Sequence, residues 1–265
     1  MRKLIVTGMP RSGTSWLGQI INSSPLVSFR TEPLFAYRFK NVINSASSAE
    51  EVNEFFERLV DVDDDFILQK DKLKDGYYPA FEKAAPTVLG FKTTRHFELL
   101  ELYLSAVADL SVVAIVRHPC AVISSWFGSY REFEKKGCDQ HRDWRSGGCR
   151  KSEVGEYWGF DDWLASTRLF LGLARRYPNF HVVRYSDLVQ STETTSQTLF
   201  SHLGLAFTEQ TRAFLDACHQ RHDDDPYSVF KDKTVLNSWE AVLDPVIRDE
   251  ILSSVNEDEL KAFLS

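Results

Sequence analysis

The sequence predicts an α/β fold of three layers, in which a mainly parallel central sheet is flanked by helices. Two observations predict this fold. Short apolar runs rich in β-branched residues alternate along the chain with longer segments of helical periodicity. The run 112–116 is apolar at every position, which is typical of a parallel strand buried on both faces. Because strands separated by helices are joined by crossover connections, they are expected to pair in parallel.

The expected strands are Lys3–Thr7, Leu26–Phe29, Thr87–Lys92, Val112–Val116 and Phe180–Arg184. The expected helices are Ser12–Asn22, Ala49–Val60, Phe97–Ala108, Ala121–Trp126, Asp161–Tyr177, Thr192–Leu203 and Glu209–Cys218. The stretch Asn44–Glu51 is interpreted as the N-terminus of a helix rather than as a linker. Since no linker, internal repeat or low-complexity tract interrupts the chain, residues 1–265 are expected to form a single domain.

A glycine-containing loop, Gly-Met-Pro-Arg-Ser-Gly-Thr-Ser-Trp at residues 8–16, connects the first expected strand to the first helix. Such a turn points several backbone N–H groups at one spot, and the helix dipole favours an anion there. The spacing of Gly8 and Gly13 is P-loop-like, but Thr14 replaces the lysine that a nucleoside triphosphatase needs, and the nearby cation is Arg11. The loop therefore predicts a phosphate cradle without triphosphate chemistry; a turn without a ligand is the alternative.

A second candidate anion site follows the buried strand at 112–116. Pro119 suits the first turn of a helix, so Arg117 is expected at the carboxyl end of the strand, where open α/β sheets bind ligands. Ser125 lies eight residues further on, two turns along that helix. A solvated strand-end charge is the alternative for Arg117 taken alone.

Together these motifs resemble those of sulfotransferases that use 3′-phosphoadenylyl sulfate (PAPS). The segment Arg-Ser-Gly-Thr-Ser-Trp at 11–16 is similar to their 5′-phosphosulfate loop, and Arg117 with Ser125 is similar to the pair that holds the 3′-phosphate. In carrying arginine at position 11, the chain resembles tyrosylprotein and carbohydrate O-sulfotransferases, whereas cytosolic members usually carry lysine at the corresponding position.

The resemblance implies a PAPS-dependent O-sulfotransferase. Such an enzyme transfers a sulfuryl group from PAPS to a hydroxyl acceptor, which is a carbohydrate, a tyrosine or phenol, or a small-molecule alcohol. It releases adenosine 3′,5′-bisphosphate (PAP), and no metal is required, because protein cations can stabilise the leaving phosphate. The cofactor-binding residues that the resemblance implies are Arg11, Ser12, Gly13, Thr14, Ser15, Trp16, Arg117, Ser125, Tyr185, Lys231 and Lys233. Trp16 and Tyr185 are expected beside the adenine, and Lys231 and Lys233 over the 3′-phosphate, although the family's Arg-Lys-Gly is absent there.

Sulfuryl transfer also needs a cation near the bridging oxygen and a base for the acceptor proton. Arg11 and Lys92, which ends the third expected strand, are the expected cations. Glu32 lies twenty-one residues after Arg11, the interval at which tyrosylprotein sulfotransferases place their catalytic glutamate. His96 lies near the catalytic histidine of cytosolic enzymes, but two residues later than their Lys-Thr-His pattern. We favour Glu32 over His96 as the base.

Two alternative functions remain open. A P-loop small-molecule kinase would need a lysine at the position of Thr14. A non-catalytic nucleotide-binding protein of the same fold would bind PAP without turnover.

Charge and hydropathy bear on partners and compartment. The net charge of −7 argues against general nucleic-acid binding. The chain has no stretch of eighteen apolar residues, and its N-terminus enters a strand within three residues, so neither a membrane segment nor a signal peptide is expected. We expect a cytoplasmic enzyme, or otherwise a luminal catalytic domain with its anchor removed.

The region around 128–159 is expected to be an insertion that forms a lid over the acceptor. Its aromatic residues can stack on a sugar or phenol, and its basic residues can attract an acidic acceptor. Cys138 and Cys149 flank His141 there and are expected to be unpaired thiols; a disulfide and a metal site are the alternatives. Cys120 and Cys218 are expected to be core thiols.

Overall fold

The computed structural model describes residues 1–128, 133, 136–220, 229–230 and 236–265. In this part of the chain the strands form one sheet of order β2-β3-β1-β4-β5, and every neighbouring pair is parallel. The strands are β1 (Arg2–Thr7), β2 (Val27–Thr31), β3 (Val88–Thr93), β4 (Leu110–Val116) and β5 (Phe180–Arg184). The predicted α/β class is confirmed.

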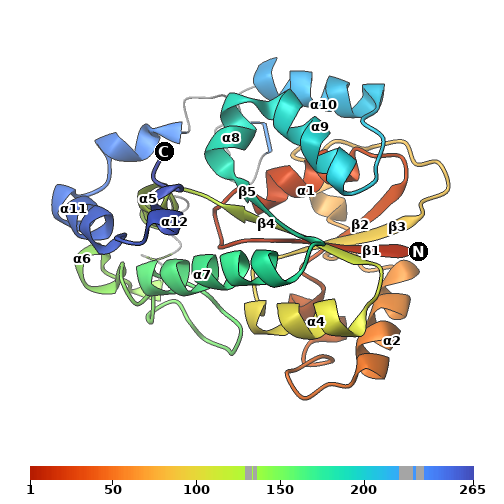
Figure 1. Cartoon of the computed structure of the whole chain (residues 1–265), viewed down its shortest axis with the longest axis horizontal. Coiled ribbons are helices and arrows are strands. Elements are labelled where there is room, and N and C mark those ends of the chain that lie inside the picture. Colours follow the sequence, from red (N-terminus) through yellow and green to blue (C-terminus); the bar gives the residue numbers. More distant parts are fainter. Residues whose placement is uncertain (129–132, 134–135, 221–228, 231–235) are drawn as a thin grey trace.

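Helices cover both faces of the sheet, which gives three layers (Figure 1). One face carries α1 (Thr14–Asn22), α8 (Tyr185–Gln190), α9 (Thr192–His202) and α10 (Glu209–Gln220). The opposite face carries α2 (Ala49–Val60), α4 (Leu100–Ala106) and α7 (Phe160–Arg176). The elements α5 (Pro119–Gly128), α6 (Gln140–Asp143), α11 (Pro245–Ser254) and α12 (Asp258–Lys261) gather near the carboxyl ends of the strands. The short helix α3 spans Lys70–Lys74.

A local sequence signal accounts for the start of helix α2. Helix α2 has the predicted bounds and begins at Ser48, whose hydroxyl accepts from the Glu51 N–H while the Glu51 carboxylate accepts from the Ser48 N–H. The helix expected at 97–108 begins as the 3₁₀ turn η3 (Phe97–Leu99) and ends at Ala106. Helices α3, α6, α8, α11 and α12 were not among the expected elements.

Two glycines let α1 lie close to the sheet. A Cβ on Gly18 of α1 would lie 3.0 Å from the ring of Phe29, and a Cβ on Gly90 of β3 would lie 2.8 Å from it. The Phe29 ring therefore fills the space between helix and sheet that these two positions leave open. Helix α1 therefore packs against β2 and β3 across this ring.

The chain places β2 and β3 on one side of β1 and then crosses to place β4 and β5 on the other side. The direction in which successive strands are added therefore reverses between β1 and β4. Open α/β sheets bind ligands in the crevice at the carboxyl ends of their strands where the order reverses. The loop 8–13 follows β1, and Arg117 follows β4. The topology thus brings the two predicted anion sites to one crevice. No helix in the described ranges combines the length and apolar character required to cross a bilayer.

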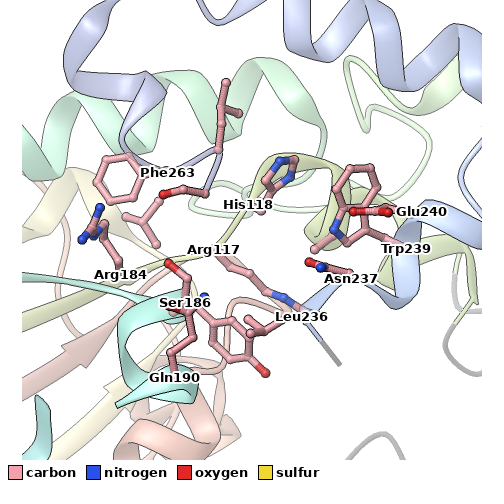
Figure 2. A pocket seen from close by; sticks show the side chains of 15 residues that line it. Arg117, His118, Arg184, Ser186, Gln190, Leu236, Asn237, Trp239, Glu240 and Phe263 are labelled. Carbon is pink, nitrogen blue, oxygen red and sulfur yellow. The ribbon is translucent and has the colours of Figure 1, made fainter. Parts of the chain in front are cut away.

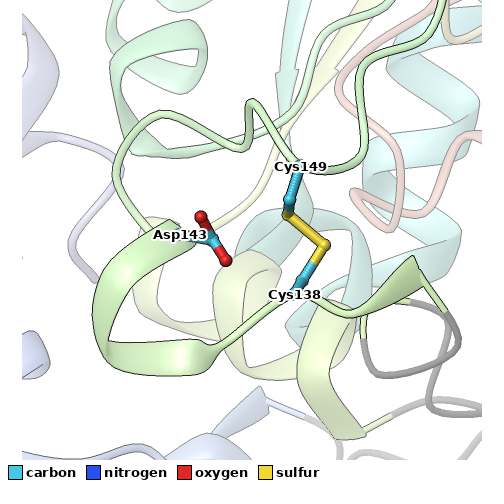
Figure 3. A group of neighbouring side chains, drawn as sticks. All are labelled: Cys138, Asp143 and Cys149. Carbon is cyan, nitrogen blue, oxygen red and sulfur yellow. A yellow bond between two sulfur atoms is a disulfide. The ribbon is translucent and has the colours of Figure 1, made fainter.

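The region expected to be a lid contains a disulfide between Cys138 and Cys149 (Figure 3). The expectation of two unpaired thiols is therefore wrong. Asp143, rather than His141, is the third potential ligand near the sulfurs. Since a metal ion binds cysteine as the thiolate, this pair offers no metal site while it is oxidised. Residues eleven apart in sequence are brought together by the fold of the loop between them, and spacing alone does not specify that approach.

Reduction of this disulfide is expected to lower the free energy of unfolding by about 2–3 kcal/mol, because the bridge restricts the unfolded chain. Urea denaturation of the wild type with and without a thiol reductant measures the effect. The double variant Cys138→Ser, Cys149→Ser is the control, since its midpoint should be low and insensitive to the reductant. An unchanged wild-type midpoint after verified reduction would contradict the prediction.

Candidate functional site

The loop after β1 requires glycine at two positions. A Cβ on Gly8 would lie 2.5 Å from the carbonyl oxygen of Ile115 on β4, and Gly8 has φ 152°. Gly13 has φ 93°, and its Cβ would lie 2.7 Å from the ring of Tyr185. Gly13 is also the residue before α1 and offers no side chain to cap it, so N–H groups of its first turn remain for a ligand. A helix N-terminus of this kind favours an anion.

Arg11, Arg117 and Ser125 come from distant segments and meet beside this loop. The Arg11 Nε donates to the Ser125 Oγ at 3.1 Å, and the Arg117 Nη1 donates to the carbonyl oxygen of Arg11 at 3.1 Å. The guanidinium of Arg117 lies 4.6 Å from the centre of the Tyr185 ring, which contacts the Trp16 ring edge-to-face at 6.2 Å. Two cations, a hydroxyl and two aromatic rings thus form one connected group of side chains.

The structure describes some of the remaining residues of the predicted cofactor site and not others. Ser12 is 1% exposed, and its hydroxyl has no hydrogen-bond partner among the described residues, so it is a buried polar atom beside the cradle. Thr14 and Ser15 open helix α1. Lys231 and Lys233 lie outside the described residues.

A cavity of about 270 Å³ extends from Arg117 at the carboxyl ends of β4 and β5 (Figure 2). Three polar side chains that line it, those of His118, Gln190 and Asn237, were not predicted from the sequence. His118 directly follows Arg117 in Arg-His-Pro, which is the only local signal that pointed to it. Gln190 and Asn237 carry no such signal, because chain folding alone brings α8 and the segment before Trp239 to this cavity.

His118 is held in a neutral state. Its ring stacks on Trp239 with 4.6 Å between ring centres, and the Cys120 N–H donates to its Nδ1 at 3.2 Å. Burial, together with the positive charge of Arg117, lowers the pKa of His118 to about 4. At neutral pH His118 therefore adds no positive charge beside Arg117, and its ring packs against Trp239.

A second polar cluster lies where β2 and β3 end. Glu32 and Lys92 are 8% and 9% exposed, and the Lys92 Nζ lies 3.3 Å from the Glu32 Oε1. The Lys92 Nζ also donates to the Ser15 Oγ at 3.4 Å. The N–H and hydroxyl of Thr94 donate to Oε1 of Glu32 at 2.9 and 2.8 Å, and the Thr93 hydroxyl donates to Oε2 at 3.2 Å. Lys92 therefore links the Glu32 carboxylate to Ser15 in the first turn of α1.

His96, the other candidate base, contacts the insertion. The His96 N–H donates to the Gly155 carbonyl oxygen at 2.8 Å, and a Cβ on Gly155 would overlap the His96 ring. The Nδ1 of His96 lies 3.1 Å from Oε1 of Glu98, whose other oxygen accepts from the Tyr157 hydroxyl at 2.7 Å. These contacts give His96 a place in docking the insertion 128–159 on the turn after β3.

Comparison with known proteins decides the family. A model of the sulfotransferase family matches residues 3–209, most of the chain. The chain belongs to the sulfotransferase family. A search of curated protein sequences found no match for it.

Solved structures with the same fold include sulfotransferases. Mouse sulfotransferase SULT7A1 complexed with PAP has a TM-score of 0.58 and 15% identity, covering 99% of this chain and 88% of that one. The sulfotransferase domain of the Synechococcus PCC 7002 olefin synthase has a TM-score of 0.56 and 16% identity, covering 96% and 94%. Retinol dehydratase in complex with retinol and PAP has a TM-score of 0.54 and 14% identity, covering 98% and 82%. At these identities the likeness shows a shared fold.

Proposed function

We propose that this sulfotransferase uses PAPS as its sulfuryl donor and a hydroxyl group as its acceptor. The observation that carries the proposal is the meeting of Arg11, Arg117 and Ser125 beside an uncapped helix N-terminus. Together they offer two positive charges and a hydroxyl beside a backbone cradle, which suits a nucleotide with two separate phosphate groups. PAP is bound in the related mouse enzyme and in retinol dehydratase, in keeping with this donor.

In the proposed complex, the 5′-phosphosulfate lies on the loop 8–13 with Arg11, and the 3′-phosphate lies on Arg117 and Ser125. Tyr185 and Trp16 supply the aromatic side of the adenine pocket. The buried Ser12 hydroxyl, which has no hydrogen-bond partner among the described residues, can donate to a phosphate oxygen. The positive charges of Arg11 and Lys92 take the place of a metal ion, so the proposal requires no metal.

In the proposed chemical step, Glu32 is the base. The acceptor oxygen forms a bond to sulfur while the bond from sulfur to the bridging phosphate oxygen breaks, and the acceptor proton passes to Glu32. The Lys92 Nζ contacts both the Glu32 carboxylate and the Ser15 hydroxyl. Its charge can therefore stabilise the bridging oxygen as negative charge develops there. PAP and the sulfate ester leave, and the proton returns from Glu32 to water.

Calorimetric titration in the presence of a metal chelator is expected to show tighter binding of PAP than of 5′-AMP. ATP with Mg²⁺, titrated without the chelator, should bind more weakly than PAP, because Thr14 replaces the lysine of a triphosphate site. Tighter binding of ATP–Mg²⁺ would contradict the donor assignment and favour the kinase alternative. Binding of PAP without transfer of label from PAPS to any hydroxyl acceptor would favour the non-catalytic alternative.

A further inference from the structure

Two exposed phenylalanines form an aromatic surface next to the proposed base. Phe35 is 49% exposed and Phe66 is 42% exposed, and their ring centres lie 5.7 Å apart. We refer to Phe35 and Phe66 as the aromatic shelf. The two rings expose apolar surface to water, and a ligand that covers this surface removes it from water.

The shelf is tied to the Glu32 cluster from several sides. Phe35 ends the 3₁₀ turn η1 (Pro33–Phe35), which begins directly after Glu32, and the Phe35 N–H donates to the Glu32 carbonyl oxygen at 3.0 Å. The guanidinium of Arg95 lies 4.3 Å from the centre of the Phe35 ring, and Arg95 follows Thr94. Since Thr94 donates two hydrogen bonds to the Glu32 carboxylate, the shelf and the proposed base share one support.

The segment that carries Phe66 is likewise anchored to the sheet. The Thr31 N–H, at the end of β2, donates to the carbonyl oxygen of Ile67 at 2.9 Å. The Ile67 N–H in turn donates to the Asp64 side chain at 2.9 Å. The two rings of the shelf are therefore held by β2 and by the turn that follows it.

The charges around the shelf do not favour an anionic acceptor. Arg95 is paired with the buried carboxylate of Glu156. Burial alone would raise the pKa of Glu156, but hydrogen bonds from Ser152 and Arg95 lower it to about 2, so the pair is charged and neutral overall at working pH. Lys40 is paired with Glu153 at 2.6 Å.

Basic side chains of the insertion are paired in the same way. The pairs are Arg142 with Asp143, Arg145 with Asp161, and Lys151 with Asp162. The acidic run 61–65 directly precedes Phe66. The sequence-based idea that basic residues of the insertion attract an acidic acceptor is therefore not supported by these three residues.

We infer that the aromatic shelf binds the acceptor, and that the acceptor is a neutral alcohol or phenol with an apolar or aromatic body. The inference rests on the proposed function, because it takes the Glu32 side of the crevice as the acceptor side. The hydroxyl of such an acceptor forms the new oxygen–sulfur bond and gives its proton to Glu32, while its apolar body covers Phe35 and Phe66. An anionic glycan would meet paired cations and an acidic run there instead.

The test compares matched neutral and anionic acceptors with labelled PAPS and the full chain. The pairs are 2-naphthol with 6-hydroxy-2-naphthoate and 1-octanol with 8-hydroxyoctanoate, beside one uronic-acid oligosaccharide. The neutral member of at least one pair is expected to show a kcat/KM about tenfold or more above that of its carboxylate. Burying the apolar ring or chain on the shelf is favourable for both members, but the anionic member also has to desolvate its carboxylate. Equal or better turnover of the carboxylates or of the oligosaccharide, or no turnover of either neutral acceptor, would overturn the inference.

Variants locate the site of that preference. Phe35→Ala and Phe66→Ala are each expected to raise KM for the preferred neutral acceptor about tenfold and to leave KM for PAPS unchanged. Phe35→Leu should restore part of the affinity, and Val246→Ala, at a 65% exposed position on α11, should change neither constant. KM values within twofold of the wild type in both alanine variants would overturn the inference. Absence of PAP binding in the wild type would instead contradict the proposed function itself.

Discussion

The variant Glu32→Gln is expected to lower kcat by a factor of about 10²–10⁴, because glutamine keeps the size of the side chain but cannot take the acceptor proton. Its amide oxygen can still accept from the N–H and hydroxyl of Thr94, so the turn after β3 should keep its shape. Initial rates with labelled PAPS at saturating acceptor measure kcat. PAP affinity, measured by calorimetry, should be nearly unchanged.

The control for this prediction is His96→Asn, compared on the same acceptor. Since the His96 ring contacts Glu98 and its N–H donates to Gly155 of the insertion, this variant should alter acceptor KM more than kcat. If His96→Asn abolishes turnover while Glu32→Gln does not, His96 is the base. If both variants keep most of their activity, neither residue is.

Two further variants separate loss of the base from loss of a cation. Arg11→Ala and Lys92→Ala should lower turnover through poorer stabilisation of the leaving phosphate, whichever residue is the base. An acceptor with a more acidic hydroxyl needs less help from a base. It should therefore recover activity in Glu32→Gln but not in Lys92→Ala.

The variant Arg117→Ala is expected to weaken PAP binding roughly 10- to 100-fold, because a charged hydrogen bond to the 3′-phosphate contributes about 1.5–3 kcal/mol. Its own contacts with the Arg11 carbonyl oxygen and the Tyr185 ring are also lost, so the loop itself needs a control. Titration with 5′-AMP supplies it, since 5′-AMP lacks the 3′-phosphate. Equal weakening of PAP and 5′-AMP would mean that Arg117 supports the loop rather than the phosphate.

Arg117→Lys sharpens the comparison. Lysine keeps the positive charge but not the planar fork that can bind a phosphate through two nitrogens. PAP affinity between those of the wild type and Arg117→Ala is therefore expected, with thermal unfolding of both variants measured to show that the fold is retained. Wild-type affinity in Arg117→Ala would remove this residue from the site.

Features that depend on neighbours in sequence were predictable. The five strands were expected near their observed places because apolar runs of that length fit buried parallel strands. Gly8 and Gly13 predicted a strand-to-helix turn, and both have backbone conformations or close approaches that require glycine. Arg117 was likewise predicted at the end of β4, and Pro119 was predicted in the first turn of the helix that follows, which is α5. Helix α11 was missed although Asp244 and Pro245 begin it with a standard cap, so a local signal was present but not used.

The contacts between side chains in the candidate site could not be predicted in the same way. The sequence by itself determined the α/β class and brought Arg11 and Arg117 to the same edge of a parallel sheet, since both follow strands and periodicity is a local property. Only the tertiary structure decided that Glu32 pairs with Lys92 and that Cys138 pairs with Cys149. It also decided which side chains reach the cavity beside Arg117. Such contacts depend on how whole elements pack, and packing is fixed by shape and burial across the molecule rather than by spacing along the chain.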